Sequence, residues 1–427
     1  MKVLVVGGGG REHAMAWALH RSPHVTKLYC TDPNPGMLAL AECIHMDASD
    51  TEGLAAWAEA NGIDLTVVGP EGPLNLGIVD AFERRGLRIF GPNRAAAEIE
   101  GSTVFAKELM RKYGIPTAAY HICSTPEEAL AVLEKMGAPV VVKADGLAAG
   151  KGALVCQTLD EAKQAVQSIM VDRIFGDSGN RVVIEEFLVG EEASLLAFVD
   201  GERFVSMVPA QDHKAIYEGD KGPNTGGMGA YSPAPVVTPE LLVQIENEIV
   251  RPTVEAMRAE GRPYRGVLYV GLMITDAGPK VVEFNCRFGD PEAQAVIPRL
   301  KNDLFEVIQA TLDGRLDEIE LVWDERPCVC VVLASGGYPG SFETGYVIHG
   351  LDKAAAREDV LLFHGGTRER DGNIVTSGGR VISVVALGDD IQSAVYRAYE
   401  AVGDIRFEGM VYRRDIAHRA LAAKPTA

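Results

Sequence analysis

Short apolar runs alternate with amphipathic stretches along the first hundred residues of this 427-residue chain. Apolar runs at 2–6, 27–30, 64–68 and 87–90 alternate with stretches of helical period at 11–20, 51–60 and 74–85. Strands that are separated by helices pair as a parallel sheet with right-handed crossovers. Because such sheets bind ligands at the carboxyl ends of their strands, we expect a site at the glycine-rich turns 7–11 and 69–72.

The length and charge of the chain limit its organisation and its partners. A chain of 427 residues is too long for one hydrophobic core, so about three domains are expected. The net charge of −19 argues against binding to nucleic acids or anionic membranes, which need a positive surface. The chain has no run of 18 apolar residues, no signal peptide and no CxxC pair among its seven cysteines. These features predict a soluble cytoplasmic enzyme with reduced thiols, and we expect a monomer.

The pattern of elements changes twice along the chain. Residues 1–101 predict a Rossmann-like parallel α/β domain, and 102–326 predict a second domain in which strands and helices mix. Within the second domain, a polar loop at 209–235 and a helix at 239–260 separate strands that look antiparallel. Residues 327–427 are rich in β-branched side chains and predict a small α+β domain. The predicted fold class is therefore a multidomain α/β and α+β protein.

The first glycine-rich turn runs from Gly7 to His13, directly after the first strand. Glycines allow a tight turn that presents backbone N–H groups to an anion at a helix N-terminus. A dinucleotide-binding fingerprint fails here, because its third glycine would fall at Glu12. Arg11 suits a terminal phosphate, since its guanidinium can pair two phosphate oxygens. We therefore prefer a small phosphorylated ligand, and a plain strand–helix turn is the structural alternative.

The second turn contains Pro70 and Glu71, at the end of another strand of the same predicted sheet. A carboxylate in this place can accept hydrogen bonds from sugar hydroxyls. The alternative is that Glu71 stabilises the N-terminus of the helix that begins near Leu74.

The most specific motif surrounds Lys143. An apolar strand at 139–143 ends in this lysine, and a loop of small residues at 144–152 precedes another strand. The Gly150-Lys151-Gly152 segment is not a P-loop, because neither a Ser/Thr nor a helix follows it. A strand lysine that faces a glycine-rich flap is another way to hold nucleotide phosphates.

Four acids lie at 185–192, beside an apolar strand. Backbone groups of Glu186, Phe187 and Leu188 are placed to read the edge of adenine, and Glu192 to hold ribose hydroxyls. At least two of these acids are expected to be solvated charges only.

Three polar side chains alternate at 283, 285 and 287, in and just after a strand. Glu283 and Asn285 point to one face, one pleat apart, and offer the hard oxygen ligands that suit Mg²⁺. Arg287 continues that face and can bind a carboxylate or the charge that develops on a phosphate.

The predicted 209–235 loop carries two polar motifs, at 211–214 and at 222–231. A loop this long inside a compact domain is usually functional. Asp212 can bind an ammonium group, and glycines such as Gly226 and Gly227 let backbone amides approach a small ligand. His213 is a weaker candidate for a general base, because a loop histidine is more often structural.

Taken together, these motifs resemble the glycinamide ribonucleotide synthetase family of ATP-grasp enzymes, over essentially the whole chain. The most specific pieces are the segments 143–152, 222–230 and 283–292. The resemblance implies an ATP-grasp domain whose B subdomain, about 123–190, is mobile. It also implies an ATP-dependent ligase that joins glycine to 5-phospho-D-ribosylamine through glycyl phosphate, with Mg²⁺ or Mn²⁺, in purine biosynthesis.

The resemblance also assigns roles to residues of this sequence. Lys143 and Arg287 are the implied catalytic residues, and Glu283 and Asn285 the implied metal ligands. ATP contacts are implied for Lys107, Lys143, Asp145, Gly150, Lys151, Gly152, Glu185, Glu186, Phe187, Leu188 and Glu192. Substrate contacts are implied for Gly9, Gly10, Arg11, Glu12, Pro70, Glu71, Asp212, Gly226, Gly227, Met228 and Arg287.

The chain departs from the family pattern in two places. Gly101-Ser102 is followed by Thr103 where the family often has lysine, which leaves Lys107, one helical turn away, as the expected phosphate contact. The segment after the second strand reads Thr31-Asp32-Pro33-Asn34 instead of the usual Ala-Pro-Gly-Asn.

Two alternative functions remain open from the sequence. Another ATP-grasp enzyme, such as a biotin-carboxylase-like or an aminoimidazole ribonucleotide carboxylating enzyme, would share Lys143, Glu283 and Asn285 but should lack the 222–230 motif. An NAD-binding oxidoreductase built on 1–100 is disfavoured by the missing third glycine.

Overall fold

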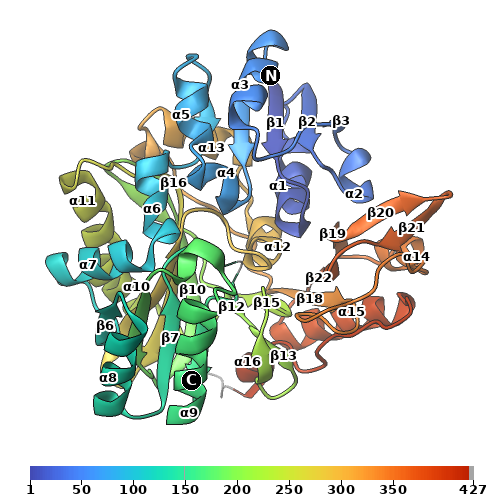
Figure 1. Ribbon diagram of the computed structural model, residues 1–427. Helices are drawn as coiled ribbons and strands as arrows, with labels where there is room; N and C mark the ends of the chain where they lie inside the picture. The colour runs from blue at the N-terminus through green and yellow to red at the C-terminus, as the bar shows by residue number, and fades with distance from the viewer. Residues whose placement is uncertain (149, 423–427) are drawn as a thin grey trace.

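The computed structural model describes residues 1–148 and 150–422, and it begins with the predicted parallel sheet. The strand order is β3-β2-β1-β4-β5, and every pair is parallel. The strands are β1 (Lys2–Val6), β2 (Lys27–Thr31), β3 (Glu42–Ile44), β4 (Leu65–Val68) and β5 (Ile89–Phe90). The sheet lies at the top of Figure 1, where α1 (Gly10–His20) and α3 (Thr51–Ala60) accompany it.

The helix predicted over 74–85 is wrong in its extent. Two helices stand in its place, α4 (Glu71–Asn75) and α5 (Ile78–Glu83). Gly77 separates them with a φ of +89°. This left-handed conformation is open to glycine and ends one helix before the next begins. The first of the two helices, α4, also starts at Glu71, three residues earlier than expected.

A second sheet corresponds to part of the segment 123–190. Its order is β6-β9-β7-β8, with β6 (Tyr120–Cys123), β7 (Val140–Ala144), β8 (Ala153–Cys156) and β9 (Val182–Glu186), all antiparallel. Helices α8 (Pro126–Met136) and α9 (Leu159–Val166) pack on it, and their apolar residues share one core with the strands. This unit forms the lower left of the molecule in Figure 1.

The central sheet has the order β11-β10-β16-β17 and is antiparallel, as expected. Its strands are β10 (Glu191–Asp200), β11 (Phe204–Ser206), β16 (Arg265–Thr275) and β17 (Gly278–Asn285). Helix α7 (Thr103–Tyr113) packs against β17, and α13 (Leu304–Leu312) against β10 and β16. Strand β17 ends at Asn285, which brings the predicted metal ligands to the end of this sheet.

The helix predicted at 239–260 is present with a change of winding in its middle. Helix α10 (Pro239–Ile245) passes through a π-helical turn at Glu246–Val250 into α11 (Arg251–Ala259). Pro252 is the second residue after this turn. A proline has no N–H and clashes with a preceding α-helical carbonyl, and a wider turn relieves that clash.

The prediction of one polar loop over 209–235 is also wrong. This segment contains β12 (Gln211–Asp212), β13 (Ala215–Tyr217), β14 (Lys221–Asn224) and β15 (Gly229–Ser232). Strands β12 and β15 join a third sheet of order β12-β15-β18-β22-β19, with β18 (Cys328–Ala334), β19 (Val360–His364) and β22 (Arg380–Leu387). The sheet thus crosses the boundary predicted at 326/327. Short polar strands that pair with residues a hundred positions away carry little local signal.

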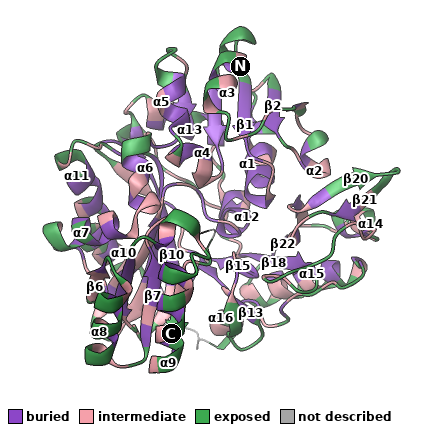
Figure 2. Ribbon diagram, viewed as in Figure 1, coloured by how far each residue is buried: buried purple, intermediate pink, exposed green. Residues whose placement is uncertain are grey.

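Helix α15 (Ile391–Asp404) packs on β18 and β22, which Figure 2 shows as buried. A ribbon of β20 (Thr367–Arg370) and β21 (Asn373–Thr376) extends from this C-terminal unit. Among the described residues, no helix is both long and apolar enough to cross a bilayer.

The N-terminal and C-terminal units meet at two buried histidines. The backbone N–H of His364 donates to Nδ1 of His13 at 2.8 Å. Asn34 spans the same contact, because its side-chain amide donates to the carbonyl oxygens of Gly8 and His364 at 2.9 and 2.8 Å. The departure from the family pattern at 31–34 therefore still places an asparagine where it joins two parts of the chain.

This contact predicts a loss of stability in acid. Burial lowers the pKa of His13 to about 3 and that of His364 to about 4. Both histidines are neutral when folded but bind protons below about pH 6.5 when unfolded, so their contribution is complete above that pH and is lost as the pH falls. At pH 5 each costs up to about 2 kcal/mol. The His13→Asn variant, which cannot take up a proton, should lose less of its melting temperature between pH 7.5 and pH 5.5 than the wild type.

The exposed His121→Asn variant is the control. Equal losses for the wild type and the His13→Asn variant would contradict this account.

Candidate active site

A cavity of about 330 Å³ is lined by residues of the second, central and third sheets, and by Arg11 and Glu71 beside the parallel sheet. It brings together many of the residues predicted from separate motifs: Arg11, Glu71, Lys143, Gly150, Glu185, Glu186, Phe187, Leu188, Glu192, Asp212, Gly226, Glu283, Asn285 and Arg287. An adjoining cavity of about 150 Å³ adds Lys107 and Gly152 and shares Lys143 with the first. A third, of about 200 Å³, contains Gly9 and Gly10. Of the predicted residues, Glu12, Pro70, Asp145, Lys151, Gly227 and Met228 do not line these three cavities.

Two buried lysines share one carboxylate at the junction of the first two cavities. Oε1 of Glu185 lies 3.0 Å from Nζ of Lys107 and 3.1 Å from Nζ of Lys143. The Lys143 ammonium also donates to the carbonyl of Val282 at 2.8 Å. Burial lowers the pKa of Lys107 to about 8, against the opposing effect of Glu185. The pair offers concentrated positive charge for a polyphosphate, and the Glu185 carboxylate is occupied by the lysines. A contact of Glu185 with adenosine stays a prediction.

Five apolar side chains line part of the main cavity, and we call them the apolar slot: Val141, Val155, Phe187, Leu188 and Met273. They come from β7, β8, β16 and the segment after β9. Phe187 is 36% exposed. This slot has the apolar character that an adenine ring needs.

The predicted metal ligands lie in a group of carboxylates. Glu283 and Asn285 line both cavities with Arg287. The Asn285 side-chain oxygen accepts a hydrogen bond from Nη1 of Arg287 at 3.1 Å. Three more acids, Glu192, Asp212 and Glu292, line the main cavity. Carboxylate and amide oxygens in excess of the nearby cations suit a hard divalent ion, so these side chains fit Mg²⁺ or Mn²⁺.

Lys214 is a functional candidate that the sequence did not single out. Its ammonium lies 3.3 Å from Glu192 and 3.7 Å from Glu283. Burial opposes its charge, but the carboxylates of Glu192, Asp212 and Glu283 together raise its pKa well above the usual value. Asp212 shows the opposite balance, because burial raises its pKa well above the usual range despite the nearby lysine. The only sequence signal for Lys214 is its place beside Asp212 and His213.

Arg287 connects this group to the turn after β4. Its guanidinium pairs with Glu71 at 3.1 Å and with Glu100 at 3.0 Å. Glu100 is a second residue that the sequence did not reveal. Glu71 is thus in the cavity wall and fixed by an arginine, which places its carboxylate beside Arg11.

The first glycine-rich turn is held by Glu12. This buried carboxylate accepts hydrogen bonds from the N–H of Gly9 at 2.8 Å and from Nε of Arg11 at 2.7 Å. A Cβ on Gly69 would lie 2.0 Å from Oε1 of Glu12, so only glycine fits at that position of the second turn. Glu12 thereby holds both turns together. Its predicted substrate contact is not tested, but its carboxylate is already occupied.

Arg380 of β22 is the third unpredicted residue of the site. It reaches the main cavity from the C-terminal unit and donates to the carbonyl oxygens of Gly226 at 3.0 Å and Asp290 at 2.9 Å. It also lines the third cavity with Gly10 and Ser383. Asp290 and Glu292 lie inside the 283–292 motif that the sequence singled out, whereas nothing local distinguishes Arg380.

Asp145, at the start of the predicted flap, is held by contacts with three other residues. Its carboxylate accepts from the hydroxyl of Ser102 at 2.8 Å and from the N–H of Val104 at 3.1 Å, and it pairs with Arg181 at 2.6 Å. Thr103, which departs from the family pattern, donates its hydroxyl to the carbonyl of Ala144 at 3.1 Å. The start of α7 is thus joined to the strand that carries Lys143. Ala149 of the flap lies outside the described residues.

The amides of 226–228 differ from the expectation that they face a ligand. The N–H groups of Gly226, Gly227 and Met228 donate to Tyr338, to Thr225 and to the carbonyl of His213, at 2.9, 2.9 and 2.8 Å. Each amide therefore already has a protein acceptor. Pro70 likewise serves as the N-cap of α4.

Comparison with known proteins agrees with this geometry. The phosphoribosylglycinamide synthetase models match residues 1–100 (N domain), 101–293 (ATP-grasp domain) and 328–419 (C domain). A phosphoribosylamine–glycine ligase of Ralstonia nicotianae is 52% identical over 99% of this chain and 100% of its own length. The chain belongs to the phosphoribosylglycinamide synthetase family.

Other similar proteins support the same membership. A phosphoribosylamine–glycine ligase of Pseudomonas aeruginosa is 51% identical over 99% of both chains. The crystal structure of the Thermotoga maritima enzyme of that name has a TM-score of 0.84 and 34% identity, and covers 98% of this chain and 100% of that one. The biotin carboxylase of Campylobacter jejuni has a TM-score of 0.74 but 13% identity, over 99% of this chain and 95% of that one, which shows a shared fold alone. The comparisons thus favour the ligase family over the carboxylase alternative.

The shared carboxylate gives a testable prediction. In the Glu185→Gln variant the two lysines lose their common counter-ion, so the pKa of Lys107 should fall further and the carboxylate that fixes both ammonium groups is gone. We expect the Kd for ATP, measured by calorimetry, to rise about tenfold. The exposed Glu127→Gln variant, in the same subdomain, should bind ATP like the wild type. An unchanged Kd in the Glu185→Gln variant would show that the lysine pair does not set nucleotide affinity.

Proposed function

We propose that this protein joins glycine to 5-phospho-D-ribosylamine, with conversion of ATP to ADP and phosphate, to give glycinamide ribonucleotide in purine biosynthesis. The observation that carries the proposal is one continuous site. The main cavity is lined by Lys143, by the apolar slot and by a group of carboxylates around the Lys214 ammonium. Arg11 and Glu71, at the edge of the parallel sheet, line the same cavity. Membership of the phosphoribosylglycinamide synthetase family supports the same reaction.

The nucleotide is expected to lie along the β7–β9 side of the cavity. Adenine would occupy the slot beside Phe187 and Leu188, and its phosphates would reach Lys143 and Lys107. Glu283 and Asn285 would hold Mg²⁺, or Mn²⁺, beside those phosphates. The ion supplies charge neutralisation for phosphoryl transfer.

The first step is an attack by a glycine carboxylate oxygen on the γ-phosphorus of ATP. The new bond gives glycyl phosphate, and the bond from the γ-phosphorus to the bridging oxygen breaks to release ADP. Such a transfer depends mainly on positioning and electrostatics, which Lys143 and Arg287 provide. Asp212, which lines the same cavity, is expected to bind the glycine ammonium.

In the second step the sugar amine attacks the carbonyl carbon of glycyl phosphate. The C–N bond forms, the C–O bond to phosphate breaks, and the amine proton leaves with the phosphate. Arg11 and the first glycine-rich turn are expected to hold the sugar phosphate, with Glu71 beside the sugar hydroxyls. No protein nucleophile is needed. The 145–152 segment is expected to close over the site, because water would hydrolyse an acyl phosphate.

A coupled assay for ADP release tests the reaction. Release should require both glycine and 5-phosphoribosylamine, and the Lys143→Ala variant should lose it, because the transferred phosphoryl group loses its fixed positive charge. The exposed Lys135→Ala variant should keep wild-type rates. ADP release that depends on bicarbonate instead of glycine would replace this function with a carboxylating one.

The metal assignment gives a separate prediction. Replacement of Glu283 by glutamine removes one anionic ligand, so the Mg²⁺ concentration for half-maximal rate should rise about tenfold or more. The exposed Glu240→Gln variant is the matched control. The same Mg²⁺ dependence in both variants would remove Glu283 from the proposed metal ligands.

A further inference from the structure

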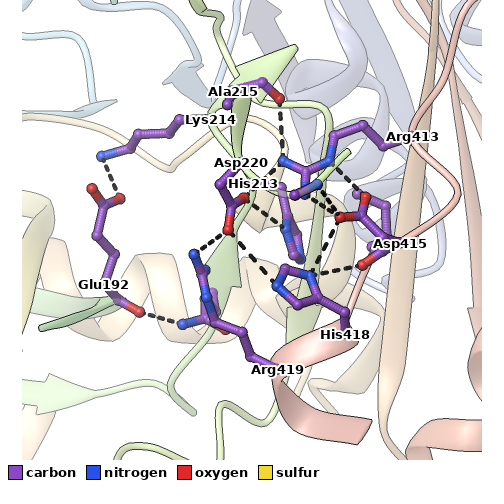
Figure 3. Close-up of polar contacts among 12 residues, drawn as sticks. Glu192, His213, Lys214, Ala215, Asp220, Arg413, Asp415, His418 and Arg419 are labelled. Carbon is purple, nitrogen blue, oxygen red and sulfur yellow. Dashed lines mark hydrogen bonds and ion pairs between the residues drawn. The ribbon is translucent and has the colours of Figure 1, made fainter. Parts of the chain in front are cut away.

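The segment 413–419, near the end of the described chain, packs against the β13–β14 ribbon, next to the active site. Arg413 is fully buried, and its Nη1 donates to the carbonyl of Ala215 at 3.2 Å and to Asp220 at 2.9 Å (Figure 3). Ala215 begins β13, and Asp220 lies in the turn before β14. The Arg413 guanidinium therefore joins the start of β13 to the turn between the two strands.

Asp415 is the second residue of this contact, and we call Arg413 and Asp415 together the clamp. It accepts two hydrogen bonds from Arg413, at Nε and Nη2, of 2.8 and 2.7 Å. The same carboxylate accepts from the N–H of Gly219 at 2.9 Å. A bidentate pair fixes both the distance and the plane of the two groups. The C-terminal segment thus holds the ribbon through charged bonds that burial strengthens.

His213 receives the C-terminal segment on the other side. Its Nε2 accepts a hydrogen bond from the N–H of Ala417 at 3.0 Å, and its ring is buried. Asp220, at 3.9 Å from Nδ1, also faces His418 and Arg419. The segment 413–419 therefore contacts β13, the turn between the two strands, and the residue that precedes Lys214.

The ribbon needs this support. Strands β13 and β14 pair only with each other, and Tyr217 is 63% exposed. A two-stranded ribbon alone is at best marginally stable in water. Its first residue follows Lys214 directly, and the Lys214 ammonium lies among the carboxylates of the main cavity. Movement of Ala215 would move that ammonium.

We propose that Arg413 is a positioning residue, which acts through the β13–β14 ribbon to hold Lys214 and Asp212 in the active site. The inference rests on the proposed function, which assigns Asp212, a carboxylate near the Lys214 ammonium, to the glycine ammonium. Lys107 lies on α7 and Lys143 on β7, and the hydrogen bonds of Arg413 and Asp415 go to neither element. Loss of these hydrogen bonds should therefore weaken glycine use much more than nucleotide binding.

Steady-state kinetics of the full chain test this role. In the Arg413→Ala variant the KM for glycine should rise about tenfold or more, and the Kd for ATP should stay within about twofold. The Arg413→Lys variant keeps the charge but not the bidentate geometry, so its KM for glycine should lie between those of the wild type and the Arg413→Ala variant. Arg414→Ala changes an exposed neighbouring arginine and should match the wild type.

A double-mutant cycle separates positioning from general stability. If Arg413 acts through Lys214, then Arg413→Lys should lower kcat/KM for glycine in the wild type but change it little in a Lys214→Ala background. Equal losses in both backgrounds, or an unchanged KM for glycine in every Arg413 variant, would overturn the proposal. If Arg413→Ala does not fold, Arg413→Lys and Asp220→Asn carry the same test. A wild-type protein without glycine-dependent ADP release would refute the proposed function instead.

Discussion

The Arg287 guanidinium joins the parts of this protein that must act together. It lies just after the central sheet and pairs with Glu71, at the edge of the parallel sheet, and with Glu100, at the end of α6 (Arg94–Gly101). All three side chains are largely shielded from solvent, so loss of Arg287 would leave two carboxylates without their counter-ion, at a cost of about 3–5 kcal/mol. The position of the parallel-sheet edge relative to Glu283 and Asn285 depends on these two ion pairs.

The rest of the site follows the same principle of shared counter-ions. Two lysines share Glu185, and several carboxylates surround Lys214. Neither group is neutral by itself, and the excess charges face one cavity. Positive charge at one end and negative charge at the other match a polyphosphate and a cation. Ligands of opposite charge would neutralise these excess charges when they bind. The free energy that burial of the unpaired charges costs is then partly recovered in the ligand-bound state.

The sequence predicted much of the frame for identifiable reasons. The parallel order of the first sheet follows from its alternating elements, and the helix at 51–60 has the predicted bounds, because Asp50 caps its N-terminus. Lys143, Glu283, Asn285 and Arg287 share one cavity as expected from strand alternation. The helix break at Gly77 and the strands within 209–235 escaped prediction, since the break is a single backbone angle and the strands are short and polar, and β15 pairs with the distant β18.

The amino-acid sequence by itself determined which chemistry is present: a strand lysine beside a glycine-rich loop, an acid–amide–arginine alternation, and glycine turns at one sheet edge. Only the tertiary structure decided which charges meet. It brought Lys107 to Glu185, Lys214 among the carboxylates, Arg380 into the cavity, and Arg413 onto the ribbon that carries Lys214. Local patterns fix what lies on one strand or one helix face. Ion pairs between residues far apart in the chain depend on how sheets pack, and no local pattern encodes that packing.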